Sequence, residues 1–255
     1  MIDIHCHILP GVDDGAKHME DSISMAQEAI KQGIHTIIAT PHHKNGRYNN
    51  PKKSILAELN ILNDRLQEEN IPLTVLPGQE VRIHGDLIDG IKQGEILALN
   101  ETSRYIFVEL PSNHVPRFTE QILFDIQVND YIPIIVHPER NAGLLENPTR
   151  LYEFIRNGAL TQITAASLIG KFGTKIKKFT NELIEHNLTH FIASDAHNTR
   201  TRTFYMQEAS REVRRTYGGE TLYTLMENAQ LLIDNQMIYI DEPYQIKRKK
   251  FFGLF

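Results

Sequence analysis

The chain has 255 residues, of which 41% are hydrophobic and 23% are charged. A chain of this length buries about three quarters of the surface that its unfolded form exposes, which excludes a disulfide-stapled miniprotein and a disordered tail. The 27 Lys and Arg residues and 32 Asp and Glu residues give a formal net charge of −5, which disfavours non-specific electrostatic binding of nucleic acid over most of the surface. The single cysteine, Cys6, excludes an intrachain disulfide.

The cellular location and domain count follow from what the sequence lacks. Residues 1–15 have neither the basic start nor the apolar core of a signal peptide, and no stretch approaches the roughly eighteen apolar residues of a membrane span. We therefore expect a soluble cytoplasmic protein. No linker, repeat or low-complexity stretch divides the chain, which predicts one domain over residues 1–246 and a short basic-aromatic tail over 247–255.

Short apolar runs alternate along the chain with amphipathic helical patterns. This alternation is typical of a mostly parallel sheet covered by helices, an α/β fold. The runs predict strands over 2–5, 35–40, 73–81, 105–110, 132–137, 160–165 and 190–195. The apolar periodicity predicts helices over 22–32, 52–69, 120–128, 175–186 and 204–217.

Acidic and imidazole side chains stand at or just beyond the ends of six of these seven strands. In a barrel of parallel strands those ends converge on one face, where the active sites of such barrels are built. The joint placement therefore predicts one metal site. In chain order the residues are His5 and His7, His42, Glu80, Glu109, His137, and Asp195 with His197.

The first motif, His5-Cys6-His7, has a spacing that suits metal binding. Side chains alternate along a strand, so the two imidazoles share one face and Cys6 points the other way. With carboxylates and no thiolate, the donor set suits manganese, iron or zinc and differs from a closed structural zinc site. Asp13-Asp14-Gly15, taken alone, would predict only a turn.

Taken together, these motifs resemble the PHP (polymerase and histidinol phosphatase) superfamily and, within it, the bacterial capsule-type tyrosine-protein phosphatases. The resemblance covers HCHILPGVDDG, ATPHH, PGQEV, IFVEL, VHPER, QITAASLIG and SDAHN, in that order. It implies a distorted seven-stranded, TIM-like β/α barrel of PHP type. It also implies a site for three ions, usually Mn²⁺, and hydrolysis of phosphotyrosine on a membrane-associated tyrosine autokinase that regulates polysaccharide export.

The same resemblance implies a ligand set for each ion. One ion would be bound by His5, His7, Glu80 and Asp195. Glu80 would bridge to a second ion, also bound by Glu109 and His137. The third would be bound by Asp14, His42 and His197. Other PHP phosphoesterases often have histidines at the positions of Asp14 and Glu109, so a histidinol-phosphatase function is the less favoured alternative.

The expected reaction is in-line attack on phosphorus by a metal-activated hydroxide. Three divalent ions against four carboxylates leave about two positive charges, which attract a phosphate monoester. Iron, zinc or magnesium could substitute for manganese. Arg140 and Arg202 follow ligand positions closely, and their planar donor forks suit phosphoryl oxygens. The plainer interpretation of each arginine is a surface ion pair.

Several alternatives compete with this interpretation. Cysteine-dependent tyrosine phosphatases carry an arginine six residues after the cysteine, but Val12 stands there, so Cys6 is expected to be a buried inert thiol. An amidohydrolase would need a lysine near Glu109, and a nuclease would need a basic groove. A non-catalytic, metal-stabilised regulator that binds a phosphorylated protein stays open, as does the oligomeric state. His43 and His114 are candidates for substrate contact.

The C-terminal segment KRKKFFGLF differs in composition from the rest of the chain. Four consecutive basic residues, 247–250, precede three phenylalanines and a leucine. The plain interpretation is a frayed tail or one that packs on the domain. The alternative is a peripheral contact of residues Lys247 to Phe255 with an anionic membrane or with the membrane-bound kinase.

Overall fold

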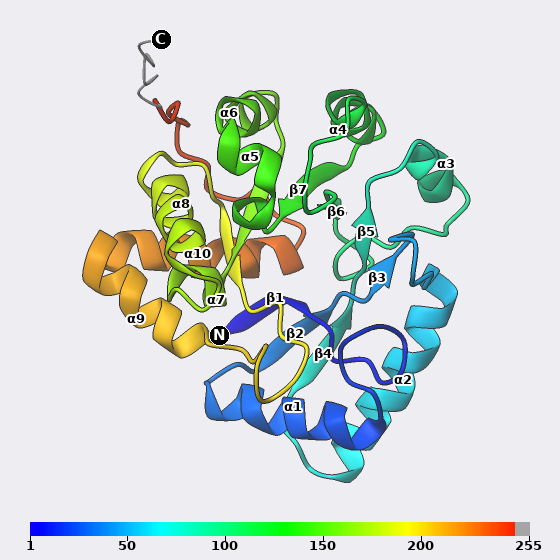
Figure 1. The fold of residues 1–255 in the computed structure, drawn as a ribbon. Helices are drawn as coiled ribbons and strands as arrows, with labels where there is room; N and C mark the ends of the chain where they lie inside the picture. The colour runs from blue at the N-terminus through cyan, green and yellow to red at the C-terminus, as the bar shows by residue number, and fades with distance from the viewer. Residues whose placement is uncertain (248–255) are drawn as a thin grey trace.

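The strands lie at the centre of the computed structural model, which describes residues 1–247 (Figure 1). Within that range nine strands form two sheets, and all pairs are parallel. The first sheet has the order β1-β2-β4 and the second has the order β3-β5-β6-β7-β8-β9. Their bounds are β1 Ile2–Cys6, β2 Thr36–Ala39, β3 His42–His43, β4 Thr74–Pro77, β5 Glu80–Arg82, β6 Tyr105–Glu109, β7 Ile132–Val136, β8 Leu160–Thr164 and β9 Phe191–Ala193.

The second predicted strand, 35–40, is β2, with the short strand β3 added after it, whereas the third predicted strand, 73–81, is divided into β4 and β5. Pro41 lacks an N–H for a sheet hydrogen bond and separates β2 from β3. Gly78 and Gln79 separate β4 from β5, and a Cβ at Gly78 would lie 2.5 Å from Ile38 Cγ2. The Gln79 side chain is buried and donates to the Asn50 carbonyl at 2.6 Å. The described chain therefore has two sheets where one seven-stranded sheet was predicted.

The outer strands of the two sheets meet just beyond β9. The Asp195 backbone N–H donates to the His5 carbonyl at 2.9 Å, and the His7 N–H donates to the Ala196 carbonyl at 2.9 Å. Cys6 and Ala196 form an isolated parallel bridge. These bonds place the end of β1 beside the segment that follows β9.

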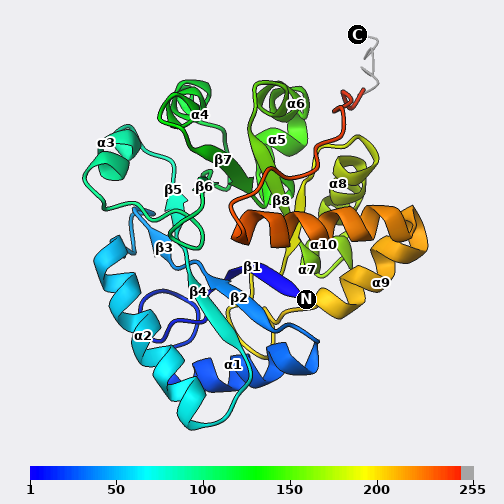
Figure 2. The ribbon, with the colours of Figure 1, turned by 180° about the vertical axis from the view of Figure 1, so that it is seen from behind.

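Helices surround the strands on the outside of the molecule (Figure 2). The five predicted helices are present, with α1 beginning three residues earlier than expected. The α2 side chains Ile55, Leu59, Leu62 and Leu66 form the buried stripe that the periodicity predicted. The helices are α1 Met19–Lys31, α2 Lys52–Glu68, α3 Leu87–Lys92, α4 Thr119–Val128, α5 Ala142–Glu146, α6 Thr149–Arg156, α7 Ala165–Leu168, α8 Thr174–Glu185, α9 Met206–Tyr217 and α10 Gly219–Ile233, with a 3-10 turn at Pro138–Arg140.

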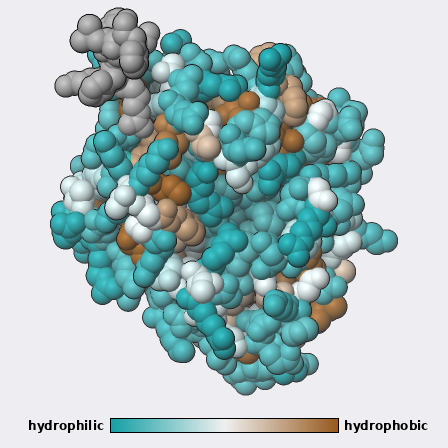
Figure 3. Space-filling model, viewed as in Figure 1, coloured by the Kyte–Doolittle hydropathy of each residue, from teal (hydrophilic) through white to brown (hydrophobic). Residues whose placement is uncertain are grey.

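The surface is predominantly hydrophilic on the face shown in Figure 3, where apolar side chains form small separate patches. No helix in residues 1–247 is both long enough and apolar enough to cross a membrane. The predicted boundary at residue 246 falls at the end of the described range. Of the predicted tail, residues 248–255 lie outside the described residues, and Lys247 is exposed.

Candidate metal centre

The end of β1 brings His5 and His7 onto one face, as the spacing predicted. Their Nε2 atoms lie 3.3 Å apart, and both residues are almost fully buried. Cys6 is fully buried and its Sγ lies 3.6 Å from the Ala196 carbonyl oxygen, away from the two imidazoles. Burial raises the pKa of the Cys6 thiol well above its usual value. The thiol is therefore protonated and shielded, as expected for an inert cysteine.

Glu80, the first residue of β5, lies among four imidazoles. Its Oε2 is 3.5 Å from His5 Nε2, 3.4 Å from His7 Nε2 and 2.8 Å from His42 Nδ1. Its other oxygen, Oε1, is 2.7 Å from His137 Nε2. A carboxylate with imidazole nitrogens near both of its oxygens has the arrangement needed to bridge two cations.

Asp195 approaches the same two histidines as Glu80 does. Its Oδ1 is 3.6 Å from His5 Nε2 and 3.3 Å from His7 Nε2. Its Oδ2 accepts hydrogen bonds from Arg140 and, at 2.9 Å, from Arg202. Both predicted arginines therefore reach the cluster, and their side chains are 24% and 31% exposed.

The remaining predicted ligands join the cluster through His42. Asp14 Oδ1 lies 3.4 Å from His42 Nε2 and 3.5 Å from His197 Nε2. Glu109 Oε2 lies 3.7 Å from His42 Nδ1. Donor atoms within 4.8 Å of one another form three overlapping groups: His7, Asp14, His42 and His197; His5, His7 and Glu80; and His42, Glu80 and Glu109.

The donor atoms in this cluster fit divalent cations. His42 Nδ1, His197 Nε2 and Glu80 Oε2 are buried, and none of them makes a hydrogen bond of acceptable angle within residues 1–247, although His42 Nδ1 and Glu80 Oε2 lie 2.8 Å apart. Buried polar atoms of native proteins are nearly always paired, and leaving one unpaired costs about 1–3 kcal/mol. A cation between imidazole nitrogens and carboxylate oxygens would satisfy all three atoms at once.

Burial and neighbouring charges set the protonation of the cluster. Burial lowers the pKa of His137 to about 3, with a further contribution from Arg140, so this imidazole keeps a free lone pair at neutral pH. Burial and the charge of Glu80 raise the pKa of Glu109 to about 7. Burial opposes ionisation of Asp195 too, but Arg140 and His197 outweigh it and hold the pKa of Asp195 well below its usual value.

Three residues that the sequence analysis did not assign to the site orient its ligands. Asp13 Oδ2 lies 2.7 Å from His7 Nδ1, and Gln162 Oε1 lies 2.8 Å from His5 Nδ1. These acceptors favour a proton on each Nδ1, which would leave each Nε2 as the atom that binds a cation. Arg82 binds both oxygens of Glu109 at 2.9 Å. Arg82 and Glu109 are paired in the β5–β6 register, and Gln162 lies in the motif QITAASLIG.

The loop after β1 depends on a glycine. A Cβ on Gly15 would lie 2.0 Å from the His7 carbonyl oxygen and 2.5 Å from His7 Cβ, so a side chain at this position does not fit. His137 and Asp195 have positive φ angles of 35° and 52°. Such backbone conformations are uncommon for non-glycine residues and concentrate at functional sites, where the surrounding structure holds them.

Other predicted histidines lie outside the cluster or at its margin. His43 is buried, with Nε2 3.6 Å from Glu95 Oε1, and so faces the helix side of β3. His114 is exposed in the loop after β6, and its carbonyl accepts from Asn141, the neighbour of Arg140. His190, which directly precedes β9, is buried.

Comparison with known sequences identifies close relatives. A family model described as capsular polysaccharide synthesis, CpsB/CapC, matches residues 1–234. Tyrosine-protein phosphatase YwqE of Bacillus subtilis (strain 168) is 51% identical over 255 residues, covering 100% of both chains. The putative tyrosine-protein phosphatase CapC of Staphylococcus aureus is 42% identical, again over 100% of both. Tyrosine-protein phosphatase CpsB of Streptococcus pneumoniae is 33% identical over 93% of this chain and 100% of that protein.

Solved structures agree with these relatives. The crystal structure of YwqE, described as a metal-dependent tyrosine phosphatase, superposes with a TM-score of 0.95 and covers 97% of this chain and 100% of that chain. An organophosphorus hydrolase from Deinococcus radiodurans superposes with a TM-score of 0.55 at 14% identity, over 91% of this chain and 92% of that chain. The second likeness shows the fold alone.

Proposed function

The chain belongs to the CpsB/CapC family of capsular polysaccharide synthesis proteins, and on that premise we propose that the cluster is the active centre of a metal-dependent tyrosine-protein phosphatase. The observation that carries the proposal is the convergence of imidazoles, carboxylates and two arginines around Glu80 and Asp195. Two arginines directed at a carboxylate-rich cluster suit a phosphoryl group better than a peptide bond.

We propose that three ions, with Mn²⁺ as the usual one, occupy the cluster. His5, His7, Glu80 and Asp195 would hold one. Glu80, Glu109 and His137 would hold the second, and Asp14, His42 and His197 the third. The close approaches of Glu80 to four imidazoles support its bridging role. When bound, the ions supply positive charge and lower the pKa of a coordinated water molecule, which provides the nucleophile.

The protein residues bind and orient the phosphate monoester. Arg140 and Arg202 would each direct N–H donors at phosphoryl oxygens, because both are partly exposed beside Asp195. The Phe172 ring lies 5.4 Å from the Arg140 guanidinium carbon and restricts its position. Cys6 takes no part in the chemistry, because it is fully buried and points away from the cluster. The leaving phenolate of tyrosine has a pKa near 10, so it needs less acid catalysis than a serine alkoxide.

The proposed substrate is a phosphotyrosine protein, specifically a membrane-associated bacterial tyrosine kinase that regulates polysaccharide export. The phosphatase would act on this kinase from the cytoplasm. The family description supports the capsule context. The residues from Lys247 onward would add a peripheral contact to that kinase or to the membrane. Deletion of residues 247–255 should weaken binding to kinase-containing vesicles, and unchanged binding would contradict this contact.

We also infer that the fold is a distorted seven-stranded β/α barrel. If β2 with β3 and β4 with β5 each count as one broken strand, the sheet orders follow a single circular sequence of seven. The hydrogen bonds between His5, His7 and the segment after β9 support this arrangement.

The test of the proposed function is a phosphatase assay on EDTA-stripped protein. Phosphotyrosine peptides, phosphoserine peptides and histidinol phosphate are compared after adding Mn, Fe, Zn or Mg. We expect phosphotyrosine hydrolysis that returns with Mn²⁺. His42→Ala should lose most of it, whereas the matched control Cys6→Ser should keep it. Turnover of histidinol phosphate alone would favour a small-molecule phosphatase, and binding of phosphotyrosine peptide without turnover would favour a regulator.

A further inference from the structure

The Phe172 ring lies against one of the two arginines of the metal centre. Its centroid is 5.4 Å from the Arg140 guanidinium carbon, a distance at which a cation and an aromatic ring attract each other. Arg140 in turn donates a hydrogen bond to Asp195 Oδ2. Phe172 is half-buried, so part of its ring surface is open to solvent. The ring therefore borders the place where a phosphoryl group held by Arg140 would lie.

A fully buried carboxylate joins the turn of Arg140 to the segment that leads to Phe172. Glu139 directly precedes Arg140 in the 3-10 turn and has no exposed surface. Its Oε1 accepts from the Thr164 N–H at 2.9 Å and from the Ser167 hydroxyl at 2.6 Å. Thr164 ends β8 and Ser167 lies in α7, both within the motif QITAASLIG. These bonds fix α7, and with it the start of the loop that carries Phe172, relative to Arg140.

A tight turn between α7 and α8 sets the direction of the Phe172 side chain. Gly170 and Gly173 have φ angles of 86° and 94°, which glycine adopts readily. The Gly173 N–H donates to the Gly170 carbonyl at 3.0 Å, which places Lys171 and Phe172 at the centre of the turn. The Lys171 ammonium lies 4.8 Å from the centroid of the Tyr205 ring, whereas the next side chain lies on the guanidinium group. The position of the Phe172 ring is thus set before a ligand enters.

The covalent structure of phosphotyrosine brings its own ring close to this position. A single oxygen atom joins the phosphorus to the phenyl ring, so the ring stays beside the group that holds the phosphate. Aromatic rings attract each other when their centroids lie about 4.5–7 Å apart, in offset or edge-to-face arrangements. The Phe172 centroid is that close to the guanidinium group that would hold the phosphate. Phosphoserine has only a methylene group at this place, which offers no ring contact.

Tyr48 is a second half-buried ring near the metal centre, but it contacts a different group. Its ring is stacked with the His42 imidazole, with centroids 6.2 Å apart, and the Arg47 guanidinium carbon lies 5.0 Å from its centroid. Within residues 1–247 no cation–π contact joins Tyr48 to Arg140 or Arg202. Phe172 is therefore the ring that lies beside the phosphate-binding arginines.

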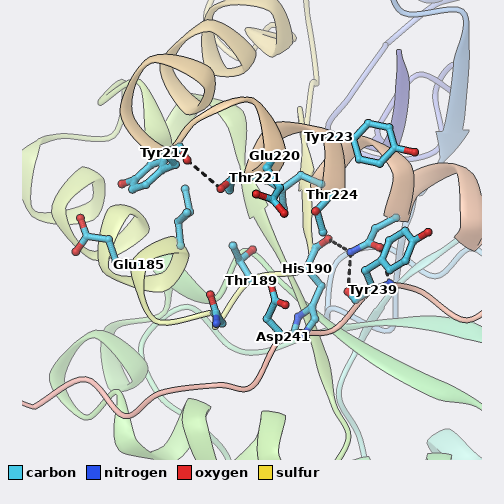
Figure 4. Close-up of a pocket in the computed structure, with 14 residues that line it drawn as sticks. Glu185, Thr189, His190, Tyr217, Glu220, Thr221, Tyr223, Thr224, Tyr239 and Asp241 are labelled. Atoms are coloured by element: carbon cyan, nitrogen blue, oxygen red, sulfur yellow. Dashed lines mark hydrogen bonds between the residues drawn. The ribbon is translucent and has the colours of Figure 1, made fainter.

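The cavity shown in Figure 4 does not suit a phosphate ester. It has a volume of about 670 Å³ and includes His190, at the other end of β9 from the metal centre. Its charged lining residues are Glu185, Glu220 and Asp241, and no lysine or arginine lines it in the described part of the chain. Carboxylates repel a phosphate dianion. The strand ends beside Arg140 are therefore the better place for the ester.

We propose that Phe172 selects aryl phosphate esters. With the phosphoryl group on Arg140, the phenyl ring of phosphotyrosine packs against the open part of the Phe172 ring. The contact strengthens the binding of phosphotyrosine and is absent for an aliphatic ester such as phosphoserine. This inference rests on the proposed function, because it takes Arg140 as a phosphate-binding residue.

Calorimetric titration of the Mn²⁺-loaded protein with benzylphosphonate and methylphosphonate tests this role. Both ligands carry the same phosphonate group, and neither is hydrolysed; in benzylphosphonate a methylene group replaces the ester oxygen. Phe172→Leu should weaken benzylphosphonate binding by about 3–10-fold, because the ring contact is lost, and should leave methylphosphonate binding unchanged. Phe172→Tyr keeps the ring and should keep the original affinity for benzylphosphonate. The kcat/KM for a phosphotyrosine peptide should change in parallel with benzylphosphonate affinity in both variants.

Phe124→Leu is the matched control, since it removes an exposed ring from α4 and should change neither affinity. An equal loss for both phosphonates in Phe172→Leu would mean that the ring acts only by positioning Arg140, and would overturn the proposal. An unchanged affinity for benzylphosphonate would overturn it as well. If the original chain bound benzylphosphonate in a Phe172-dependent way but did not hydrolyse phosphotyrosine, the proposed function would fail and the aryl contact would stand.

Discussion

The substitution Asp13→Asn tests whether a residue outside the ligand set controls metal binding. Asp13 Oδ2 accepts from His7 Nδ1 at 2.7 Å and from the His42 backbone N–H at 3.1 Å, while Oδ1 accepts from the Gly15 N–H at 2.9 Å. Asparagine has the same shape, but one of its oxygens is replaced by an NH₂ group. Whichever way the amide turns, a donor then faces a buried N–H.

The size of the effect follows from the hydrogen bond that is lost. A hydrogen bond to a charged group contributes about 1.5–3 kcal/mol, and the Asp13 side chain is fully buried. Loss of this acceptor also allows the His7 proton to move to Nε2, the atom that would bind a cation. Substitution of a residue that forms a hydrogen bond to a metal ligand typically lowers metal affinity by about 10–100-fold. We expect a loss of that size.

The assay is titration of Mn²⁺ into EDTA-stripped protein, followed by phosphotyrosine hydrolysis as a function of Mn²⁺ concentration. Asp64→Asn, which changes an exposed aspartate of α2, is the matched control and should bind Mn²⁺ as the original chain does. Activity of Asp13→Asn should recover in part when Mn²⁺ is raised. If a folded Asp13→Asn protein bound Mn²⁺ with unchanged affinity, the orienting role of Asp13 would be refuted.

Three further predictions concern a cysteine, a glycine and a histidine. Cys6→Ser should keep phosphotyrosine hydrolysis within about two-fold, and the native thiol should resist iodoacetamide, because it is buried and protonated; rapid inactivation would contradict this. Gly15→Ala should destabilise the fold by about 1–3 kcal/mol in urea unfolding, because its Cβ would overlap His7. Burial lowers the pKa of His190 to about 4 in the folded chain. The free energy of unfolding should therefore fall as the pH drops from about 6.5 to 4, because His190 is protonated in the unfolded chain over this range and still neutral in the folded one. The loss should reach about 3 kcal/mol, and His190→Gln should lack this component.

The strand-end pattern predicted much of this molecule because parallel strands deliver their final residues to one place. His5, His7, Glu80 and Asp195 lie within a few ångströms of one another although up to 190 residues separate them. Alternation along β1 also placed Cys6 correctly on the far face. The strand-end positions and the alternation of side chains along a strand can both be recognised in a single sequence.

Other features depend on pairings that a single sequence does not encode. Arg82 meets Glu109 only through the β5–β6 register, and Gln162 reaches His5 from a strand 157 residues away. The break of the third predicted strand depends on Gly78 packing against Ile38, whereas the run LTVLPGQEV has the composition of one continuous strand. The helix α10 was not predicted, although Leu222, Leu225, Ala229 and Leu232 form its buried face.

The division into two sheets has a consequence for folding. His5 belongs to β1 of the smaller sheet, whereas His42, Glu80 and Glu109 belong to β3, β5 and β6 of the larger one. A cation shared by these residues would act as a cross-link between the sheets, and its binding energy would add to their association. Removal of the cation by a chelator should then weaken the contact between the two sheets before either sheet unfolds. Amides at the ends of β1 and β3 would show this first, by exchanging hydrogen faster.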